Sequence, residues 1–300
     1  MSEQLYTVWT ITGLQGVYVG SQTEVSLSTD LSLLRANSLL LSARDLLNLN
    51  KRQYKDIGDC NWFLVHRALQ GLIRDAERAR NTESLQDALM AFQVVKPIET
   101  YGFIFQGIEF EQGRVTWEKT VYSWPMSAGQ WARMRIFDQD LLGQAGAMLT
   151  RVQTVMVGSD IAKRNAVHLL QLALEHPHPY VACFLAVTGI EAILDSKGRW
   201  DFETKLCDLL GASTLAFPDW NSPDSSPPRY TVKELAVHLY TLRNKVAHGA
   251  DLKKAAQDKN SPVDLLQLKE YIPEGEPVLY TMLLGESSIY LLCRVLQKVL

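Results

Sequence analysis

The sequence predicts a chain of two parts, an α+β domain followed by an all-α helical bundle, and a protein that is predominantly helical overall. Two observations predict this. Apolar residues in the first part include runs typical of strands, and from about Phe137 the pattern takes the helical period and keeps it. Helix-capping and helix-breaking residues then recur along the second part. We expect the α+β domain to span residues 1–135 and the bundle to span 136–300.

Two hairpins are predicted in the first part. Residues 5–12 and 16–27 alternate as strands do, and glycines between them supply a turn. Residues 101–108 and 115–124 form a second candidate hairpin around the Glu-Gln-Gly at 111–113.

Two helices are predicted between these hairpins. Asp30 is placed to cap a leucine-rich stretch over 31–41, and a second apolar pattern covers 62–73. The far face of the second pattern carries four arginines, interrupted by two acidic residues: Arg67, Arg74, Arg78 and Arg80, with Asp75 and Glu77. A face that binds nucleic acid and an ordinary solvated helix face are both compatible with this pattern, and the solvated face is the better interpretation.

The second part is a succession of helical patterns separated by breaks. The predicted helices cover residues 141–157, 161–174, 180–195, 202–210, a stretch capped by Thr231, and 279–300. His176-Pro177-His178-Pro179 forces a break, and residues 218–229 and 251–261 are predicted loops. After Thr231, apolar residues repeat at spacings of three and four, as on a helix packed in a bundle.

Composition limits the function classes. The 300 residues carry a formal net charge of −3, which excludes binding of nucleic acid through a basic excess spread over the chain. Any nucleic-acid site must therefore be confined to a small part of the surface. The first residues lack a basic stretch followed by an apolar one, and the most apolar run, 180–194, is interrupted by polar residues, so we expect no membrane segment. Four scattered cysteines favour a reducing, cytoplasmic compartment.

The motifs of several large enzyme classes are absent from the sequence. It contains no GxxxxGK[ST], GxGxxG, HExxH or GxSxG. The histidines at 176 and 178 are interpreted as part of a loop, since a metal site would need further converging ligands. We therefore expect no metal and no cofactor.

The chemistry-bearing residues cluster at the end of the helix that Thr231 begins. Arg243 offers a fork of donors suited to a phosphate, and His248 is the side chain whose charge changes most readily near neutral pH. Asn244 lies four residues before the histidine, where its amide could orient the imidazole or bind a phosphate or ribose oxygen. Gly249 is placed to end the helix.

Helix geometry separates the two principal groups. At about 100° per residue, Arg243 and His248 lie about 140° apart around one helix and cannot both reach one phosphate. Either the helix unwinds before Gly249, or a second copy of the chain supplies the missing group across a two-fold axis. The second arrangement is the favoured one, and it predicts a homodimer.

An Arg-x-x-x-x-His motif, with Asn after the Arg and Gly after the His, near the end of a late helix, resembles the signature of the HEPN superfamily, in particular its Apea-like group. The resemblance extends over about residues 159–300 and includes the helical segments at 170–175, 186–194 and 205–210. It implies an HEPN-type helical bundle. The amino-terminal half carries no such resemblance.

The resemblance implies a metal-independent endoribonuclease with two motifs meeting in a dimer. Arg243 would hold the scissile phosphate and His248 would act as general base or acid, with Asn244 and Glu191 as supporting groups and Lys245 as a substrate-binding cation. RNA would be the substrate, in prokaryotic antiviral defence or a toxin-like system, and residues 1–135 would act as a sensor or bind a protein partner. The toxin mode in which a tyrosine two residues after the histidine is modified is disfavoured, because Ala250 occupies that position.

Other functions remain open. The bundle could bind RNA or a nucleotide without cutting it, or serve only as a dimerising subunit of a larger assembly. Arg243 and His248 could be ordinary residues of a helix surface, and Lys245 could be merely solvated. Glu191 could pair structurally with either Lys205 or Arg243.

Overall fold

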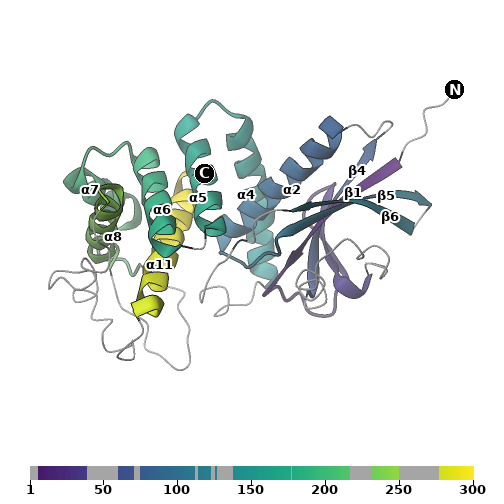
Figure 1. The fold of residues 1–300 in the computed structure, drawn as a ribbon, viewed down its shortest axis with the longest axis horizontal. Coiled ribbons are helices and arrows are strands. Elements are labelled where there is room, and N and C mark those ends of the chain that lie inside the picture. Colours follow the sequence, from purple (N-terminus) through teal and green to yellow (C-terminus); the bar gives the residue numbers. More distant parts are fainter. Residues whose placement is uncertain are drawn as a thin grey trace. The chain divides into compact units, whose positions relative to one another are not determined.

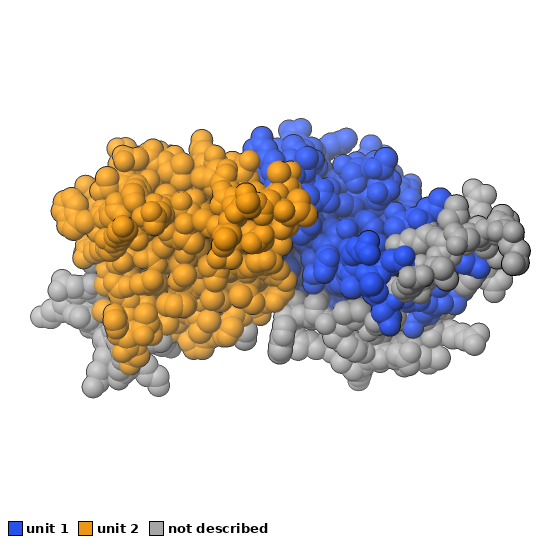
Figure 2. Space-filling view, turned by 90° about the horizontal axis from the view of Figure 1, so that it is seen from above, with its two compact units in different colours: residues 1–127, 136–153 blue, residues 128–135, 154–300 orange. Residues whose placement is uncertain are grey.

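The computed structural model describes residues 6–38, 60–70, 75–111, 114–122, 126, 138–176, 178–216, 231–249 and 277–300. The chain divides into two compact units, residues 1–127 with 136–153 and residues 128–135 with 154–300 (Figure 2). An antiparallel sheet in the first unit and helices in the second confirm the predicted fold class. The sequence places the boundary after residue 135, whereas the contacts assign 136–153 to the first unit.

A six-stranded sheet forms the centre of the first unit (Figure 1). Its spatial order is β2-β3-β4-β1-β5-β6, and every pairing is antiparallel. The strands are β1 (Tyr6–Leu14), β2 (Glu24–Ser26), β3 (Leu31–Arg35), β4 (Trp62–Gln70), β5 (Phe103–Glu111) and β6 (Arg114–Tyr122), with a short 3-10 turn, η1 (Ala36–Ser38), after β3.

One helix, α2 (Asp75–Val95), lies against the sheet and contacts β4 and β1 (Figure 1). The side chain of Gln106 on β5 donates to the carbonyl of Arg78 and to the hydroxyl of Thr82, both on α2, at 2.9 Å. Successive side chains of a strand point to opposite faces of the sheet, so the apolar residues of one face lie toward α2. The other face carries a separate core of buried residues: Ile11, Leu34, Cys60, Phe63, Val65, Tyr101, Phe103 and Phe105.

The first predicted hairpin is wrong. Strand β1 pairs with β4 and β5, while β2 pairs with β3. Because β1 is an interior strand, residues on both of its faces are buried, as Val8 and Ile11 show with 0% exposure. The second hairpin is confirmed, with β5 and β6 paired up to Glu111 opposite Arg114.

The two helices predicted before α2 are also wrong in the described residues. Residues 31–35 and 62–70 are strands, and in each the first four residues are all buried. A short run of buried, mostly apolar residues does not distinguish a strand buried on both faces from a buried helix. The remaining residues of both predictions, 39–41 and 71–73, lie outside the described residues.

The arginines of the predicted basic face therefore do not share a helix. Arg67 lies on β4, where it pairs with Glu24 at 2.8 Å, and Arg78 lies on α2, where it pairs with Glu118. Arg80 is also on α2, and Arg74 lies outside the described residues. Sequence patterns did not predict α2, because its amino-terminal half is largely polar and only its second half is continuously buried.

The helical part follows the predicted succession closely. Its described helices are α4 (Gln139–Val157), α5 (Ile161–Glu175), α6 (Pro179–Leu194), α7 (Arg199–Leu210), α8 (Val232–Ala247) and α11 (Pro277–Val299). The His-Pro break falls between α5 and α6 as predicted, with Pro179 in the first turn of α6. The loops predicted at 218–229 and 251–261 lie outside the described residues.

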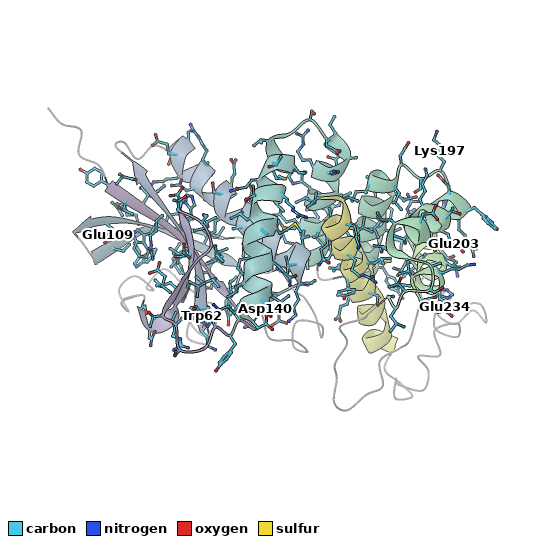
Figure 3. All side chains as sticks on the ribbon, turned by 180° about the vertical axis from the view of Figure 1, so that it is seen from behind. Trp62, Glu109, Asp140, Lys197, Glu203 and Glu234 are labelled. Carbon is cyan, nitrogen blue, oxygen red and sulfur yellow. The ribbon has the colours of Figure 1, made fainter. Side chains whose placement is uncertain are left out.

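Thr231 caps α8 as the sequence predicts. Its hydroxyl accepts from the backbone N–H of Glu234, and the Glu234 carboxylate accepts from the backbone N–H of Thr231 at 2.8 Å (Figure 3 labels Glu234). This reciprocal capping box satisfies two N–H groups that the first turn leaves without helical partners. The capping box thus defines where α8 starts, and with it the positions of the residues along this helix.

Helix α6 is the central element of the second unit. It contacts α5, α7, α8 and α11. Gly189 allows the close approach of α11, because a Cβ at this position would lie only 3.0 Å from a methyl carbon of Leu292. The face of α6 toward α8 carries the residues of the candidate site.

Among the described residues, no single helix is long and apolar enough to cross a membrane. Helices α6 and α7 reach that length and hydropathy only when taken together, across a bend of 75°.

Candidate functional site

The guanidinium of Arg243 is the centre of the candidate site. It projects from α8 one turn before the helix ends and is 24% exposed. Its Nη2 lies 2.5 Å from Oε2 of Glu191 on α6, and its Nη1 donates to Oδ1 of Asn244 at 2.8 Å. The charge of Arg243 is therefore balanced by a carboxylate from a neighbouring helix.

Glu191 is the more deeply buried partner of this ion pair, with 13% of its side chain exposed. Burial raises the pKa of its carboxyl group, and the positive charge of Arg243 works in the opposite direction. Of the two partners that the sequence leaves open for Glu191, the structure selects Arg243.

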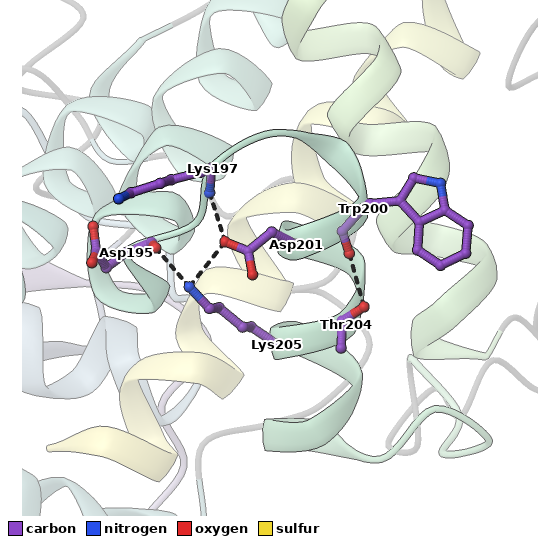
Figure 4. Close-up of polar contacts among 6 residues, drawn as sticks. All are labelled: Asp195, Lys197, Trp200, Asp201, Thr204 and Lys205. Atoms are coloured by element: carbon purple, nitrogen blue, oxygen red, sulfur yellow. Dashed lines mark hydrogen bonds and ion pairs between the residues drawn. The ribbon is translucent and has the colours of Figure 1, made fainter.

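Lys205 lies on α7 and is engaged elsewhere, with Asp201 of the same helix and with the turn between α6 and α7 (Figure 4). Its ammonium pairs with Asp201 at 2.9 Å and donates to the carbonyl of Asp195 at 2.7 Å. Asp201 also accepts from the backbone N–H of Lys197 at 2.7 Å. These contacts hold the turn together, and they explain why Lys205 is not the partner of Glu191.

Two aromatic rings enclose the guanidinium. Its Cζ lies 5.7 Å from the ring centroid of Tyr240 on α8 and 5.8 Å from that of Phe184 on α6. Both distances are within the range of cation–π attraction. Sequence reasoning missed these two residues, although Tyr240 precedes Arg243 by three positions and so shares its side of the helix.

Tyr240 also contributes a polar group. Its hydroxyl lies near the side chains of Glu191 and Asn244, and the residue is buried, with 6% exposed. Burial is the main cause of the raised pKa of this hydroxyl, and the nearby Glu191 charge adds to it. The phenol thus remains protonated and able to donate.

The amide of Asn244 serves Arg243 rather than His248. Its Oδ1 accepts from the guanidinium. Asn244 contacts His248 through the ordinary helical bond from the backbone N–H of His248 to the carbonyl of Asn244, at 3.0 Å. The expected orientation of the imidazole by this amide is not present in the described residues.

His248 ends the helix. It occupies the C-cap position with φ −92° and ψ 9°, and Gly249 follows with φ 64°, as the sequence predicts for a helix terminated by glycine. His248 is exposed, and within the described part of the chain its imidazole has no hydrogen-bond or ion-pair partner. Lys245, in the last turn, is half-buried.

No metal centre is evident where the structure is described. The described residues contain no group of three or more His, Cys, Asp or Glu side chains arranged to hold a metal ion. The four cysteines are all free thiols.

The arrangement provides a fixed cation on α8 and, on a different side of the same helix at its end, an exposed imidazole. A guanidinium held by two partners offers further N–H groups to an anionic oxygen, since it has five donors in total. The imidazole at the helix end is free to approach a bound molecule. Both groups are of the kinds that act on phosphodiesters, and an anion bound at Arg243 would share or displace the Glu191 carboxylate.

Comparison with known proteins adds no identification. No protein-family model matches the chain, and neither a curated protein nor a solved structure matches it significantly.

Proposed function

We propose that the protein is a metal-independent endoribonuclease whose site is built on Arg243 and His248. The resemblance of its motif to that of HEPN proteins suggests the reaction. A ribose 2′-hydroxyl loses its proton to His248 and attacks the adjacent phosphorus, and the bond from phosphorus to the 5′-oxygen breaks. The leaving oxygen takes up a proton. The products carry a 2′,3′-cyclic phosphate and a 5′-hydroxyl.

The observation that supports this proposal best is the restraint on Arg243. Its guanidinium is bonded to Glu191 and Asn244 and is flanked by two rings, so its position is determined before any substrate binds. A pre-organised cation stabilises the charge that develops on the phosphorane oxygens, with no reorganisation during the reaction. Asn244 and Glu191 are the supporting residues, and Lys245 is an additional cation for the RNA backbone.

The proposed active unit is a homodimer. Arg243 and His248 leave one helix in directions about 140° apart by regular helix geometry, so a single copy does not aim both at one phosphate. A two-fold axis near the end of α8 would bring the Arg243 of one copy toward the His248 of the other. We place the reaction in the cytoplasm, in antiviral defence or a toxin-like system, with the amino-terminal domain binding the partner or signal that controls it.

The test is cleavage of single-stranded RNA in excess EDTA. We expect cleavage that is lost in His248→Ala and falls at least about 100-fold in Arg243→Lys, which keeps the charge but removes the fork. His176→Ala and Arg151→Ala are the matched controls, because neither residue lies on α6 or α8. Absence of cleavage, or cleavage that both site variants retain, would refute the proposal. A monomer that cleaves RNA would refute the dimeric site alone.

The second candidate is a non-catalytic module that binds RNA or a nucleotide. The neutralisation of Arg243 by the Glu191 carboxylate at 2.5 Å favours it over cleavage, since it reduces the positive charge that the guanidinium can give to a transition state. Labelled RNA that binds equally well to the wild-type protein and to His248→Ala, with no turnover in either, would establish this alternative. A purely structural subunit would neither bind nor cleave RNA.

A further inference from the structure

Helix α5 buries one side and exposes the opposite one. It contacts α6 and α11, and five of its residues are at most 1% exposed: Ala166, Val167, Leu170, Ala173 and Leu174. Four residues on the opposite side are exposed: Ile161, Asn165, His168 and Leu172. At about 100° per residue these four lie within about 60° of one another and form a straight line along the helix, the α5 stripe. Two of them are large apolar side chains, with Ile161 60% and Leu172 49% exposed.

The α5 stripe has the same pattern when it is followed from either end. Its members are separated by four, three and four residues, with an apolar residue at each end and two polar residues in the middle. Alternating spacings of three and four are those of a seam between two packed helices. If two antiparallel copies meet about a two-fold axis between residues 166 and 167, Ile161 faces Leu172 of the second copy and Asn165 faces its His168. The stripe is therefore self-complementary, as a two-fold interface requires.

Charges beside the α5 stripe favour the antiparallel orientation. Arg164 and Glu175 lie on the same flank of the stripe, toward opposite ends of the helix. The Nη1 of Arg164 donates to the carbonyl of Gly158 at 3.1 Å, so the guanidinium extends toward the start of α5. The carboxylate of Glu175, the last residue of α5, accepts from Gln171 at 2.9 Å.

These two charges meet in the antiparallel pair. The register that pairs 161 with 172 also brings Gly158, where the Arg164 guanidinium lies, level with Glu175 of the second copy. Antiparallel helix dipoles add a further attraction. A parallel pair would instead set each charge beside its own kind, which is unfavourable at an interface. The charge distribution thus selects one orientation of a second copy.

We propose that the α5 stripe is the docking surface for a second copy of this chain, with the two α5 helices antiparallel about a two-fold axis between residues 166 and 167. Burial of Ile161 and Leu172 from both copies drives the association, and the polar pair in the middle fixes the register. This inference does not depend on the proposed ribonuclease activity. The α5 stripe contains no residue of the candidate site, and its axis differs from the one proposed near the end of α8. If both interfaces form, the chain assembles as a dimer of dimers.

The principal test is a disulfide between the two ends of the α5 stripe. Ile161→Cys and Leu172→Cys are made in a Cys207→Ser background, which removes the native thiol that is only partly buried. The two proteins are mixed, left to exchange and oxidised by air with a copper catalyst. We expect a covalent dimer, joined from 161 to 172 by mass spectrometry, in the mixture and in neither protein alone. In the antiparallel pair each cysteine lies about 16 Å along the helix from its own counterpart, beyond the reach of a disulfide.

The matched control for this disulfide uses an exposed residue of another helix. Trp200 on α7 is 83% exposed, so a cysteine there is accessible to oxidation but lies outside the α5 stripe. Ile161→Cys mixed with Trp200→Cys, in the same Cys207→Ser background, should give no covalent dimer.

A second measurement tests the same pairing without a covalent bond. Ile161→Glu combined with Leu172→Glu in one chain places like charges opposite each other at both ends of the pair, and we expect the molar mass from light scattering to halve. Ile161→Lys combined with Leu172→Glu places opposite charges together and should restore the wild-type mass. The two positions are three turns apart on α5, so they cannot compensate each other within one chain. Trp200→Glu is the control and should keep the wild-type mass.

The outcomes separate this interface from the proposed function. If the mixture gives no covalent dimer, or if either cysteine variant alone gives it as readily, the α5 interface is overturned. Equal masses for the two charge variants would also overturn it, whether or not the protein cleaves RNA. A monomer in the doubly acidic variant supports the α5 interface and refutes the dimer proposed at α8, whereas a dimer left in that variant, from a wild-type tetramer, supports both.

Discussion

Arg243 on α8 forms an ion pair with Glu191 on α6, with 2.5 Å between Nη2 and Oε2. Residues separated by more than fifty positions thus share one charge-balanced site. Both side chains are largely removed from water, at 24% and 13% exposure, so the pair is shielded from the screening that weakens surface ion pairs. Removal from water also penalises each charge, and for this reason neither is easily left without the other.

Replacement of Glu191 by Gln should separate the contribution of this ion pair to stability from its effect on anion binding. The Arg243 charge loses its counter-ion, and we expect the free energy of unfolding to fall by about 1 to 3 kcal/mol, less than for a fully buried pair. The affinity for RNA, measured by fluorescence anisotropy in the inactive His248→Ala background, should rise several-fold because an anion no longer competes with a carboxylate. Glu203→Gln on α7 is the control. Weaker RNA binding in Glu191→Gln would contradict the assignment of Arg243 as the phosphate-binding group.

The capping box of α8 should contribute measurably to stability. Thr231→Ala removes the hydroxyl that accepts from Glu234, and we expect a loss of about 1 kcal/mol in urea unfolding at neutral pH, largely restored by Thr231→Ser. Hydrogen bonds from Thr231 lower the pKa of the Glu234 carboxyl. A lowered pKa gives stability that is present above the unfolded pKa of 4.5 and is lost as pH falls through the folded pKa.

The effect of Thr231→Ala should therefore shrink in acid. A loss of stability that is independent of pH would exclude the charged form of Glu234 from the cap. Thr204→Ala, in the exposed turn of α7, is the control and should change stability by a few tenths of a kcal/mol at most.

Asp87 on α2 should make stability fall as pH rises, which is opposite to the effect of Glu234. Burial and the neighbouring Glu83 charge raise its pKa from 3.8 to about 6. Between these values the folded state holds the proton more tightly, so this residue's contribution to stability falls as pH rises from about 4 to 6 and stays low above it. We expect Asp87→Asn to be more stable than the wild-type protein by about 1 to 3 kcal/mol at pH 7.5 and equal to it near pH 4. Denaturant unfolding at both pH values checks this, with Asp208→Asn as the exposed control; an advantage that persists at pH 4 would contradict it.

The four thiols should differ in reactivity. Burial raises the pKa of Cys60 and of Cys183 to about 12 and raises that of Cys293 as well, whereas Cys207 is only partly buried. Because the thiolate is the reactive form, N-ethylmaleimide should modify Cys207 first and slowly in the native protein, and all four after denaturation. Mass spectrometry of modified peptides measures the order. Native Cys207→Ser should remain unmodified over the same period, and early modification of Cys183 would show that the core opens.

The helical part was predictable because its signals are local. Thr231 and Glu234 lie within one turn and cap the helix that they begin. The His-Pro sequence around Pro179 interrupts the helix locally, whatever the tertiary arrangement of the helices. The first part was not predictable to the same degree. Trp62–Val65 is buried on both faces because β4 lies between β1 and β3, and this depends on strands that are distant in the sequence.

The sequence by itself determined where α8 begins and ends and the order of Arg243, Asn244 and His248 along it, because the cap, the spacing and Gly249 act over a few residues. The packing of α6 against α8 selected Arg243 instead of Lys205 as the partner of Glu191 and turned Asn244 toward the guanidinium. It also placed the Phe184 ring of α6 beside the guanidinium. Hydrogen bonds and ion pairs need groups within about 3 to 4 Å, and only the tertiary structure brings residues of different helices to that distance.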